Sequence, residues 1–214
     1  MNAASSAGPV VVPTARPRVE GDREQEILAG AIVVLLDVGY DLLTFDAVAA
    51  QARASKATLY RRWKTKADLV VAAIDAAACS ETAVNPPDTG CLTSDLLAIF
   101  ADPAIDSTEI SEVMAAIFPA LHRDAEFTAV FTEKFFAPRQ LGLRTVLQRA
   151  QARGEVGPGA DLDLFAAILP AMKFHDVVVR NEPRTAGRMR QIIEEILLPA
   201  CVASRVATDA GGGA

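Results

Sequence analysis

The sequence predicts an all-α protein. An amino-terminal three-helix domain with a helix-turn-helix is followed by a larger carboxy-terminal helical bundle, with about nine helices in all. Apolar residues recur at helical spacing along most of the chain. Of the residues, 51% are hydrophobic but only 6% aromatic, and alanine fills much of the interior, which suits close helix packing. No sustained alternation of β-branched residues is bounded by turn signals, so strands are not expected.

The predicted helices fall into two domains that lie between two segments without helical periodicity. Residues 1–19, rich in Ala, Ser, Pro and Val, are expected to form a disordered arm, and residues 207–214 a disordered tail. The helix-turn-helix domain spans residues 20–66. A helix over residues 67–80 links it to the larger domain, which spans residues 81–206.

The first helix is predicted from Asp22 to Val38. Its apolar stripe keeps helical spacing, and Gly39 ends it because glycine adopts the left-handed conformation that closes many helices. The stripe consists of Ile27, Ala31, Val34, Leu35 and Val38.

Two short helices and a tight turn are predicted next. Thr44 would cap the first helix, which runs to Ala52, and Ser55 would cap the second after an Arg53-Ala54 turn. Each cap works because its side-chain oxygen accepts a free N–H of the first helical turn. The two helices and the turn between them form a helix-turn-helix.

The second short helix has an apolar and a cationic face. Leu59 and Trp63 lie four residues apart, so they share one face and would anchor the helix. The opposite face carries cations and hydroxyls, as a helix in a DNA major groove requires. Its residues are Lys56, Thr58, Tyr60, Arg61 and Arg62.

Positive charge is concentrated around this helix. Residues 44–66 contain six Lys and Arg and one Asp, whereas residues 67–214 contain 12 Lys and Arg against 20 Asp and Glu. A basic island in an acidic chain indicates a localised contact with a polyanion. A charge run alone also fits a solvated helix face, but here the caps, the turn and the anchoring pair are in register.

The run ASKATLYRRW followed by KTKADLV resembles the DNA-binding signature of TetR/AcrR-type transcriptional repressors. The resemblance covers roughly residues 20–77. It implies a DNA-binding regulator whose final two helices form a homodimer interface and whose larger domain binds a small molecule. The predicted DNA-binding residues are Thr44, Ser55, Lys56, Ala57, Thr58, Tyr60, Arg61, Arg62, Lys64 and Lys66.

The predicted contacts divide into two kinds. Lys56, Thr58 and Arg61 are candidates for base edges, because Lys or Arg donates to guanine and a Thr methyl packs on a thymine methyl. Contacts to phosphates fix the register. They are expected from Thr44, Tyr60, Arg62, Lys64 and Lys66. In a symmetric dimer two such helices meet successive major grooves, so double-stranded DNA with a palindromic operator is the expected partner.

Arg53 is the one departure from the family pattern that bears on this site. The family usually has glycine in this turn, which suits a left-handed residue; a side chain there costs on the order of 1 kcal/mol. The turn is therefore strained or closed in a different way. Arg53 would alternatively supply an extra phosphate contact.

The larger domain is predicted to begin with a loop from Thr82 to Gly90. Helical segments follow at Leu92–Ala101, Ser107–His122, Ala125–Arg153, Asp161–Arg180 and Thr185–Val206. Pro119 should kink or end the second segment and Pro138 should kink or divide the third, because proline removes a backbone donor and clashes with the preceding turn.

The last two helices are apolar over more than one stripe, so each needs two partners. One partner is their own domain, and the other is most simply the same pair from a second subunit. A wholly internal core pair is the alternative. The predicted dimer residues are Phe165, Ile168, Leu169, Met172, Ile192, Ile196 and Pro199.

Aromatic and methionine residues cluster in the middle helices of the larger domain. Simple core packing explains each residue singly, but together they would line an apolar pocket for an unknown small-molecule ligand. The predicted pocket residues are Phe100, Met114, Phe118, Phe131, Phe135, Met172 and His175.

Other chemistries lack a sequence signature. The two histidines have no nearby ligand partner and the cysteines form no CxxC pair, so neither a metal nor a cofactor is expected. No nucleophile elbow or phosphate loop is present, so an enzyme is not expected. No apolar run suits a membrane span and no signal precedes the first helix, so a cytoplasmic location is expected. The sequence predicts a DNA-binding repressor; the alternative is a ligand-binding or interaction module that has lost DNA binding.

Overall fold

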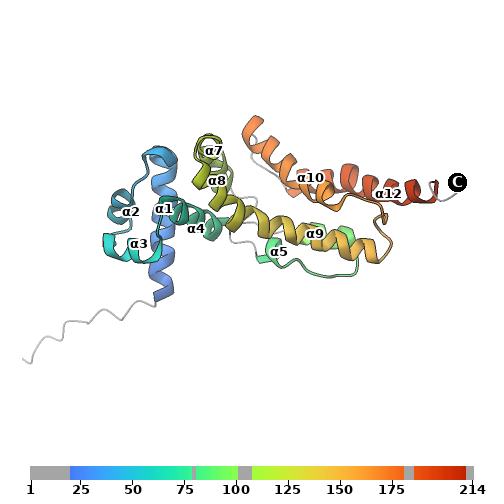
Figure 1. Ribbon diagram of the computed structural model, residues 1–214, viewed down its shortest axis with the longest axis horizontal. Coiled ribbons are helices and arrows are strands. Elements are labelled where there is room, and N and C mark those ends of the chain that lie inside the picture. Colours follow the sequence, from blue (N-terminus) through green and yellow to red (C-terminus); the bar gives the residue numbers. More distant parts are fainter. Residues whose placement is uncertain (1–19, 79–80, 101–107, 181–185, 211–214) are drawn as a thin grey trace, which may run out of the picture.

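The computed structural model describes residues 20–78, 81–100, 108–180 and 186–210. These residues form ten helices when each π-helical turn is joined to the helices that adjoin it on either side, and they contain no strand, which confirms the all-α prediction. The arm predicted over residues 1–19 lies outside the described residues. The molecule is elongated, with the first four helices at one end (Figure 1).

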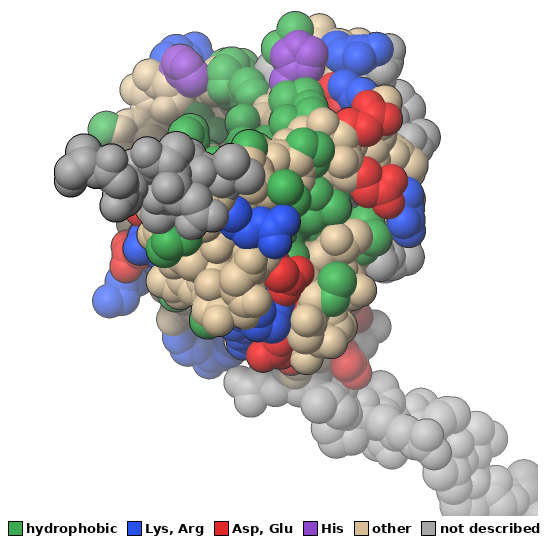
Figure 2. All heavy atoms as spheres, turned by 90° about the vertical axis from the view of Figure 1, so that its right-hand side faces the viewer, with side chains coloured by type: hydrophobic (Ala, Val, Ile, Leu, Met, Phe, Trp, Pro, Cys, Tyr) green, Lys and Arg blue, Asp and Glu red, His purple; other side chains and the backbone are tan. Residues whose placement is uncertain are grey.

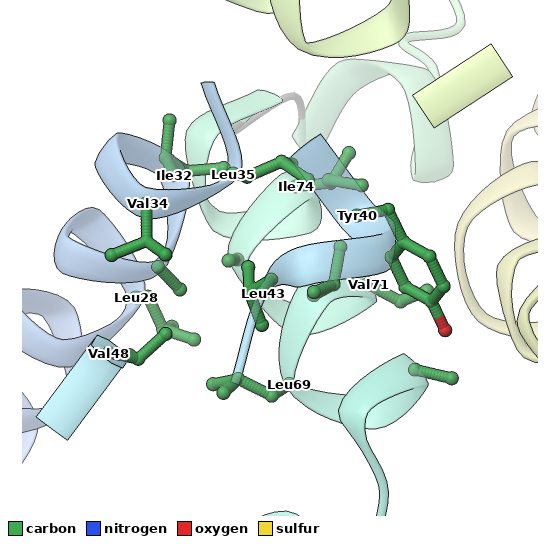
Figure 3. Close-up of a cluster of buried hydrophobic side chains, with 14 of the residues drawn as sticks. Leu28, Ile32, Val34, Leu35, Tyr40, Leu43, Val48, Leu69, Val71 and Ile74 are labelled. Atoms are coloured by element: carbon green, nitrogen blue, oxygen red, sulfur yellow. The ribbon is translucent and has the colours of Figure 1, made fainter. Parts of the chain in front are cut away.

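The amino-terminal domain consists of α1 (Glu20–Leu42), α2 (Phe45–Gln51), α3 (Lys56–Arg62) and α4 (Lys66–Ala78). Gly39 interrupts α1 with a left-handed φ of 75°, so the main part of the helix ends where predicted. Side chains of α1, α2 and α4 point into a common core, among them Leu35, Val48 and Leu69, which are fully buried (Figure 3). This core fixes the amino-terminal domain that carries α3.

The first hydrophobic core continues beyond this domain. It includes buried residues of α7 (Thr108–Arg123) and α8 (Ala125–Phe131), such as Ile117 and Phe127. The Tyr40 ring stacks on Phe127 with centroids 4.0 Å apart. The amino-terminal domain and the start of the larger domain are therefore packed together through α1 and α4.

Within the described parts of the chain, three ion pairs join the same two parts of the molecule. In each, an acid of the amino-terminal domain faces a cation of the larger domain. The pairs are Asp41–Arg123 at 2.6 Å, Asp68–Lys134 at 2.7 Å and Asp75–Arg139 at 2.9 Å. The hydrogen bond from Lys134 lowers the pKa of the Asp68 carboxyl below its usual value. Two of the three acids lie on α4, so this helix is tied to the larger domain by charge as well as by packing.

The remaining helices build the rest of the larger domain. They are α5 (Glu81–Val84), α6 (Leu92–Ile99), α9 (Ala137–Ala152), α10 (Leu162–Phe174), α11 (Ala186–Ile192) and α12 (Leu198–Ala210). The loop predicted from Thr82 to Gly90 is thus helical at its start, where buried Ala83 packs against α9. At the other end α12 runs through residues 207–210, which the sequence assigned to a disordered tail.

Three π-helical turns continue α8, α10 and α11: η1 (Thr132–Phe136), η2 (His175–Val179) and η3 (Ile193–Leu197). Two of them lie just before a proline. Before Pro138, the N–H of Ala137 donates to the carbonyl of Thr132 five residues back, and Leu198 before Pro199 donates to Ile193 in the same way. The chain stays helical from α8 through η1 to α9, so Pro138 does not divide this helix, and Pro119 lies inside α7 without ending it.

A second hydrophobic core holds α6, α9, α10 and η3 together. Leu96, Val146 and Ile193 are fully buried in it. In Figure 1 the last helices, α10 to α12, lie above α9 at the far end of the molecule from α3. The outer side of these helices therefore remains available to a partner.

Candidate DNA-binding surface and ligand cavity

The recognition helix α3 is anchored as the sequence predicts. Leu59 is fully buried and Trp63 is 6% exposed, so the apolar face of α3 packs into the first hydrophobic core. The Ser55 hydroxyl accepts from the N–H of Thr58 at 3.1 Å, and the Thr44 hydroxyl accepts from the N–H of Ala47 at 3.1 Å. Both predicted caps are confirmed, and each satisfies a free donor at a helix start.

The turn between α2 and α3 closes as a Schellman motif. The N–H of Ala54 donates to the Ala49 carbonyl at 2.8 Å, and the N–H of Arg53 donates to the Ala50 carbonyl at 3.2 Å. Arg53 is left-handed, with φ at 50°. The Arg23 guanidinium donates to the Arg53 carbonyl at 2.6 Å. The chain therefore keeps the glycine-type turn and accepts the strain of a side chain there.

Arg53→Gly should stabilise the protein by about 1 kcal/mol, because glycine adopts a left-handed φ without the steric cost of a Cβ. For a chain of this size that corresponds to a rise of roughly 2–4 °C in the unfolding midpoint, measurable by circular dichroism. Arg53→Ala keeps a Cβ and is the matched control, with no comparable rise expected. Equal midpoints for the two variants would contradict strain at this turn.

The outward face of α3 is exposed and cationic. The Lys56 ammonium pairs with the Asp46 carboxylate at 2.6 Å, and Tyr60 stacks on Phe45 with ring centroids 4.5 Å apart. Arg62 is held by two hydrogen bonds to the Glu24 carboxylate. The Ser55 and Thr58 hydroxyls lie 2.8 Å apart, so these two predicted contact residues form one polar group with the exposed Ala57 beside them.

Two predicted contact residues, Arg61 and Lys64, are exposed and make no ion pair within the described part of the chain. Lys66 has a different environment. Its ammonium donates to the carbonyl of Tyr40 at 3.0 Å and lies 4.2 Å from the centre of the Tyr40 ring. Lys66 thus closes the carboxy-terminal end of α1 in this structure, which leaves Arg61 and Lys64 as the most available cations.

The larger domain contains an apolar cavity of about 220 Å³. It includes five of the predicted pocket residues: Phe100, Met114, Phe118, Phe131 and Phe135. Met172 and His175, which were also predicted for the pocket, do not line this cavity. Met172 packs on the second hydrophobic core, and the His175 side chain is half exposed and pairs with Asp176.

The cavity wall also contains polar residues that were not predicted from the sequence. They are Arg139, Gln140 and Lys173, and among the described residues that line the cavity there is no Asp or Glu. Arg139 follows Phe135 by four residues and therefore shares its helix face, which is the signal that could have found it. The α9 helix and η1 bring both residues to the same wall.

Comparisons with known proteins agree with this architecture. Residues 27–73 match the family described as bacterial regulatory proteins, tetR family, and residues 86–196 match the tetracyclin repressor-like C-terminal domain. The chain belongs to the TetR family. Its helix-turn-helix is accordingly a DNA-binding one, and the protein is a transcriptional regulator.

Full-length relatives within the TetR family support the assignment. An uncharacterized HTH-type transcriptional regulator of Mycobacterium tuberculosis is 35% identical over 182 residues, covering 85% of this chain and 89% of that protein. The DNA-binding transcriptional repressor TetR of Mycobacteroides abscessus is 31% identical, covering 82% and 92%. The crystal structure of TetR family transcription regulator SCO0332 has a TM-score of 0.64 at 25% identity, covering 84% of this chain and 98% of that one.

The last helices of this TetR-family chain differ from the prediction in which residues face outward. Leu169 and Ile192, predicted at the dimer interface, are each 1% exposed because they pack inside the second hydrophobic core of their own subunit. Phe165, Ile168 and Met172 are partly buried against the same core. Ile196 and Pro199 are exposed. The outward apolar face instead includes Leu164 and Val202, which are 60% and 48% exposed.

This outward face lies near the end of the molecule shown in Figure 2, where hydrophobic side chains run between charged ones. None of the described helices of the TetR-family chain is both long and apolar enough to cross a membrane. Within the described residues no group of three or more His, Cys, Asp or Glu side chains could hold a metal ion.

Proposed function

We propose that this TetR-family regulator is a homodimeric repressor that binds an inverted-repeat operator and is released from it by a small apolar ligand. The observation that carries the proposal is that α4 joins an anchored, cationic α3 to the wall of an apolar cavity, since Ala78 at the end of α4 lines that cavity. A ligand that favours one position of α4 can therefore change the placement of α3.

Dimerisation is supported by the outward apolar face of the last helices. Leu164 and Val202 lie on it together with Ile196, and large apolar side chains that stay exposed on a helix pair indicate a partner surface. A two-fold pairing of this face brings the same residues together from both subunits. Two copies of α3 then meet successive major grooves about 34–36 Å apart, which calls for an inverted repeat.

Binding of the purified protein to the DNA that flanks its own coding region, measured across a salt series, tests the proposed function directly. We expect tight binding to one short palindrome that weakens steeply with salt, because cations on α3 release counterions from the phosphates. Weak binding that is equal on unrelated DNA would contradict the proposal for this region, and selection from random DNA would then identify an operator elsewhere. Deletion of the gene should raise transcription from the operator; a fall would indicate an activator instead.

Lys56 and Tyr60 are predicted to contact different parts of the operator DNA. Lys56→Ala should change the preferred operator sequence, because Lys56 is a candidate for base edges, with a discrimination of about 1–3 kcal/mol per good contact. Tyr60→Phe should weaken binding to all sequences to a similar degree, because its hydroxyl is a candidate for phosphate. Affinities of both variants across a panel of operator variants measure this, and a uniform loss for Lys56→Ala would reject its base-reading role.

Release by a ligand follows from differential affinity. A ligand shifts the balance only if it binds the DNA-competent and the released states with unequal affinity. A titration in which a saturating compound leaves operator affinity unchanged rejects that compound as an inducer. The alternative, a module that has lost DNA binding, relied on Arg53 in the turn, and the glycine-type closure of that turn removes its support.

A further inference from the structure

Arg139 contacts both the cavity and the helix that leads to the DNA-binding domain. Its guanidinium carbon lies 3.8 Å from the centre of the Phe135 ring, which lines the cavity, and Arg139 is itself a lining residue. The same guanidinium forms an ion pair with the Asp75 carboxylate on α4, with the nitrogen and oxygen 2.9 Å apart, and donates a hydrogen bond to the Phe135 carbonyl. A single side chain therefore connects the wall of the ligand cavity to α4.

The charged residues in the described part of the cavity wall have one sign. Among the described residues that line it, the two charged ones are Arg139 and Lys173, both cations, and most others are aromatic or aliphatic. Such a wall suits a ligand with an apolar body and an acidic head, because a charge away from water needs an opposite charge and hydrogen bonds.

We propose that the cavity binds small organic acids with an apolar body, and that their carboxylate replaces Asp75 as the partner of Arg139. This inference rests on the proposed function and names its ligand class and its trigger. Asp75 loses the Arg139 contact and turns to water, which its position allows because its side chain is 54% exposed while that of Arg139 is 17% exposed. Of the two ion pairs that tie α4 to the larger domain within the described residues, the one to α9 is thereby broken, while Lys134 of η1 keeps its pair with Asp68.

The exchange of partners favours the acid for a physical reason. The Asp75 carboxylate is half exposed, so water screens its charge and weakens its ion pair with the largely buried Arg139. A carboxylate inside an apolar cavity has no such screening, so its charge-assisted hydrogen bond to a guanidinium is stronger and offsets the cost of taking the carboxylate out of water. A ligand with the same body and a neutral head lacks this gain and has no means to displace Asp75.

Calorimetry of the full chain with octanoate and with 1-octanol tests the ligand class without any DNA. We expect octanoate to bind at least tenfold more tightly than 1-octanol, and the difference to disappear in Arg139→Gln while 1-octanol binding stays the same. Equal affinity of the two compounds for the original chain, or no octanoate binding up to millimolar concentrations, would overturn the assignment. If Arg139→Gln binds neither compound and its unfolding midpoint has changed, the measurement is repeated with Arg139→Lys. This variant should keep a preference for octanoate.

Two variants test the exchange of ion-pair partners at Arg139, one of them on α4 and the other in η1. Asp75→Ala removes the competing carboxylate, so octanoate should bind several-fold more tightly while its effect on operator affinity shrinks. Lys134→Ala is the matched control, because it breaks the other ion pair of α4 at Asp68 but does not line the cavity. Its octanoate affinity should stay unchanged. Unchanged octanoate affinity in Asp75→Ala, or the same gain in both variants, would overturn the exchange.

The ligand class and the release from the operator are tested by different results. If octanoate binds with the expected dependence on Arg139 but leaves operator affinity unchanged, the ligand class stands and release by that ligand is overturned. If the ligand-free protein binds no operator, the proposed repressor function fails, while the calorimetric result on octanoate and 1-octanol still decides the ligand class.

Discussion

Trp63→Ala should destabilise the protein by about 3–5 kcal/mol, the usual cost of removing a buried tryptophan side chain, and should abolish operator binding. Trp63 follows the last residue of α3 and is 6% exposed in the first hydrophobic core. Without it, the recognition helix keeps only Leu59 as a fully buried anchor. Chemical unfolding followed by circular dichroism measures the loss, because the variant has no other tryptophan to report fluorescence.

Trp63→Phe is the control for this first prediction. It keeps an apolar ring in the core and should lose clearly less stability than Trp63→Ala, with operator binding retained in part. If Trp63→Ala bound the operator like the original chain, the structural role of Trp63 as the anchor of α3 would be wrong.

Gly142→Ala should destabilise the larger domain by about 1–3 kcal/mol, the typical cost of inserting a methyl group into a closely packed site. A Cβ at Gly142 would lie 2.2 Å from the Ala83 carbonyl oxygen, a backbone atom that cannot give way without moving α5 from α9. Ala83 lines the cavity, so ligand affinity should fall as well. Thermal unfolding and calorimetry with octanoate measure the two effects.

Gly21→Ala provides the matched control for Gly142→Ala. A Cβ at Gly21 in α1 meets no heavy atom within 4 Å, so the same substitution there should cost nothing and add helix propensity. A Gly142→Ala variant as stable as Gly21→Ala would mean that α5 does not pack on α9 as the structure has it.

The amino-terminal domain was predictable because its signals are local. Caps at Thr44 and Ser55, the anchoring pair Leu59 and Trp63, and the helix end at Gly39 each depend on residues a few positions apart, and local sequence decides them. The strain at Arg53 was predictable for the same reason. The family resemblance then joined these elements into one DNA-binding domain.

The larger domain was predictable only in outline because its features depend on contacts between distant segments. A helical stripe such as Leu169 and Ile192 is apolar whether it faces its own core or another subunit, so the sequence could not separate the two. Phe135 was found as a lining residue from its apolar side chain, but Arg139 was not. Its role depends on Asp75, which lies far away in the chain on α4.

The π-helical turn η1 suggests how this cavity can change over evolutionary time. Such a turn is an α-helix that has gained a single residue, and the extra residue rotates the side chains before it relative to those after it. Phe135, Phe136 and Arg139 lie within or just after η1 and all line the cavity. Loss of one codon in this segment would return it to a regular helix and present a different set of side chains to the ligand, while α8 and α9 keep their lengths. A one-residue difference in chain length at this point is thus a route by which related regulators acquire different inducers on the same scaffold.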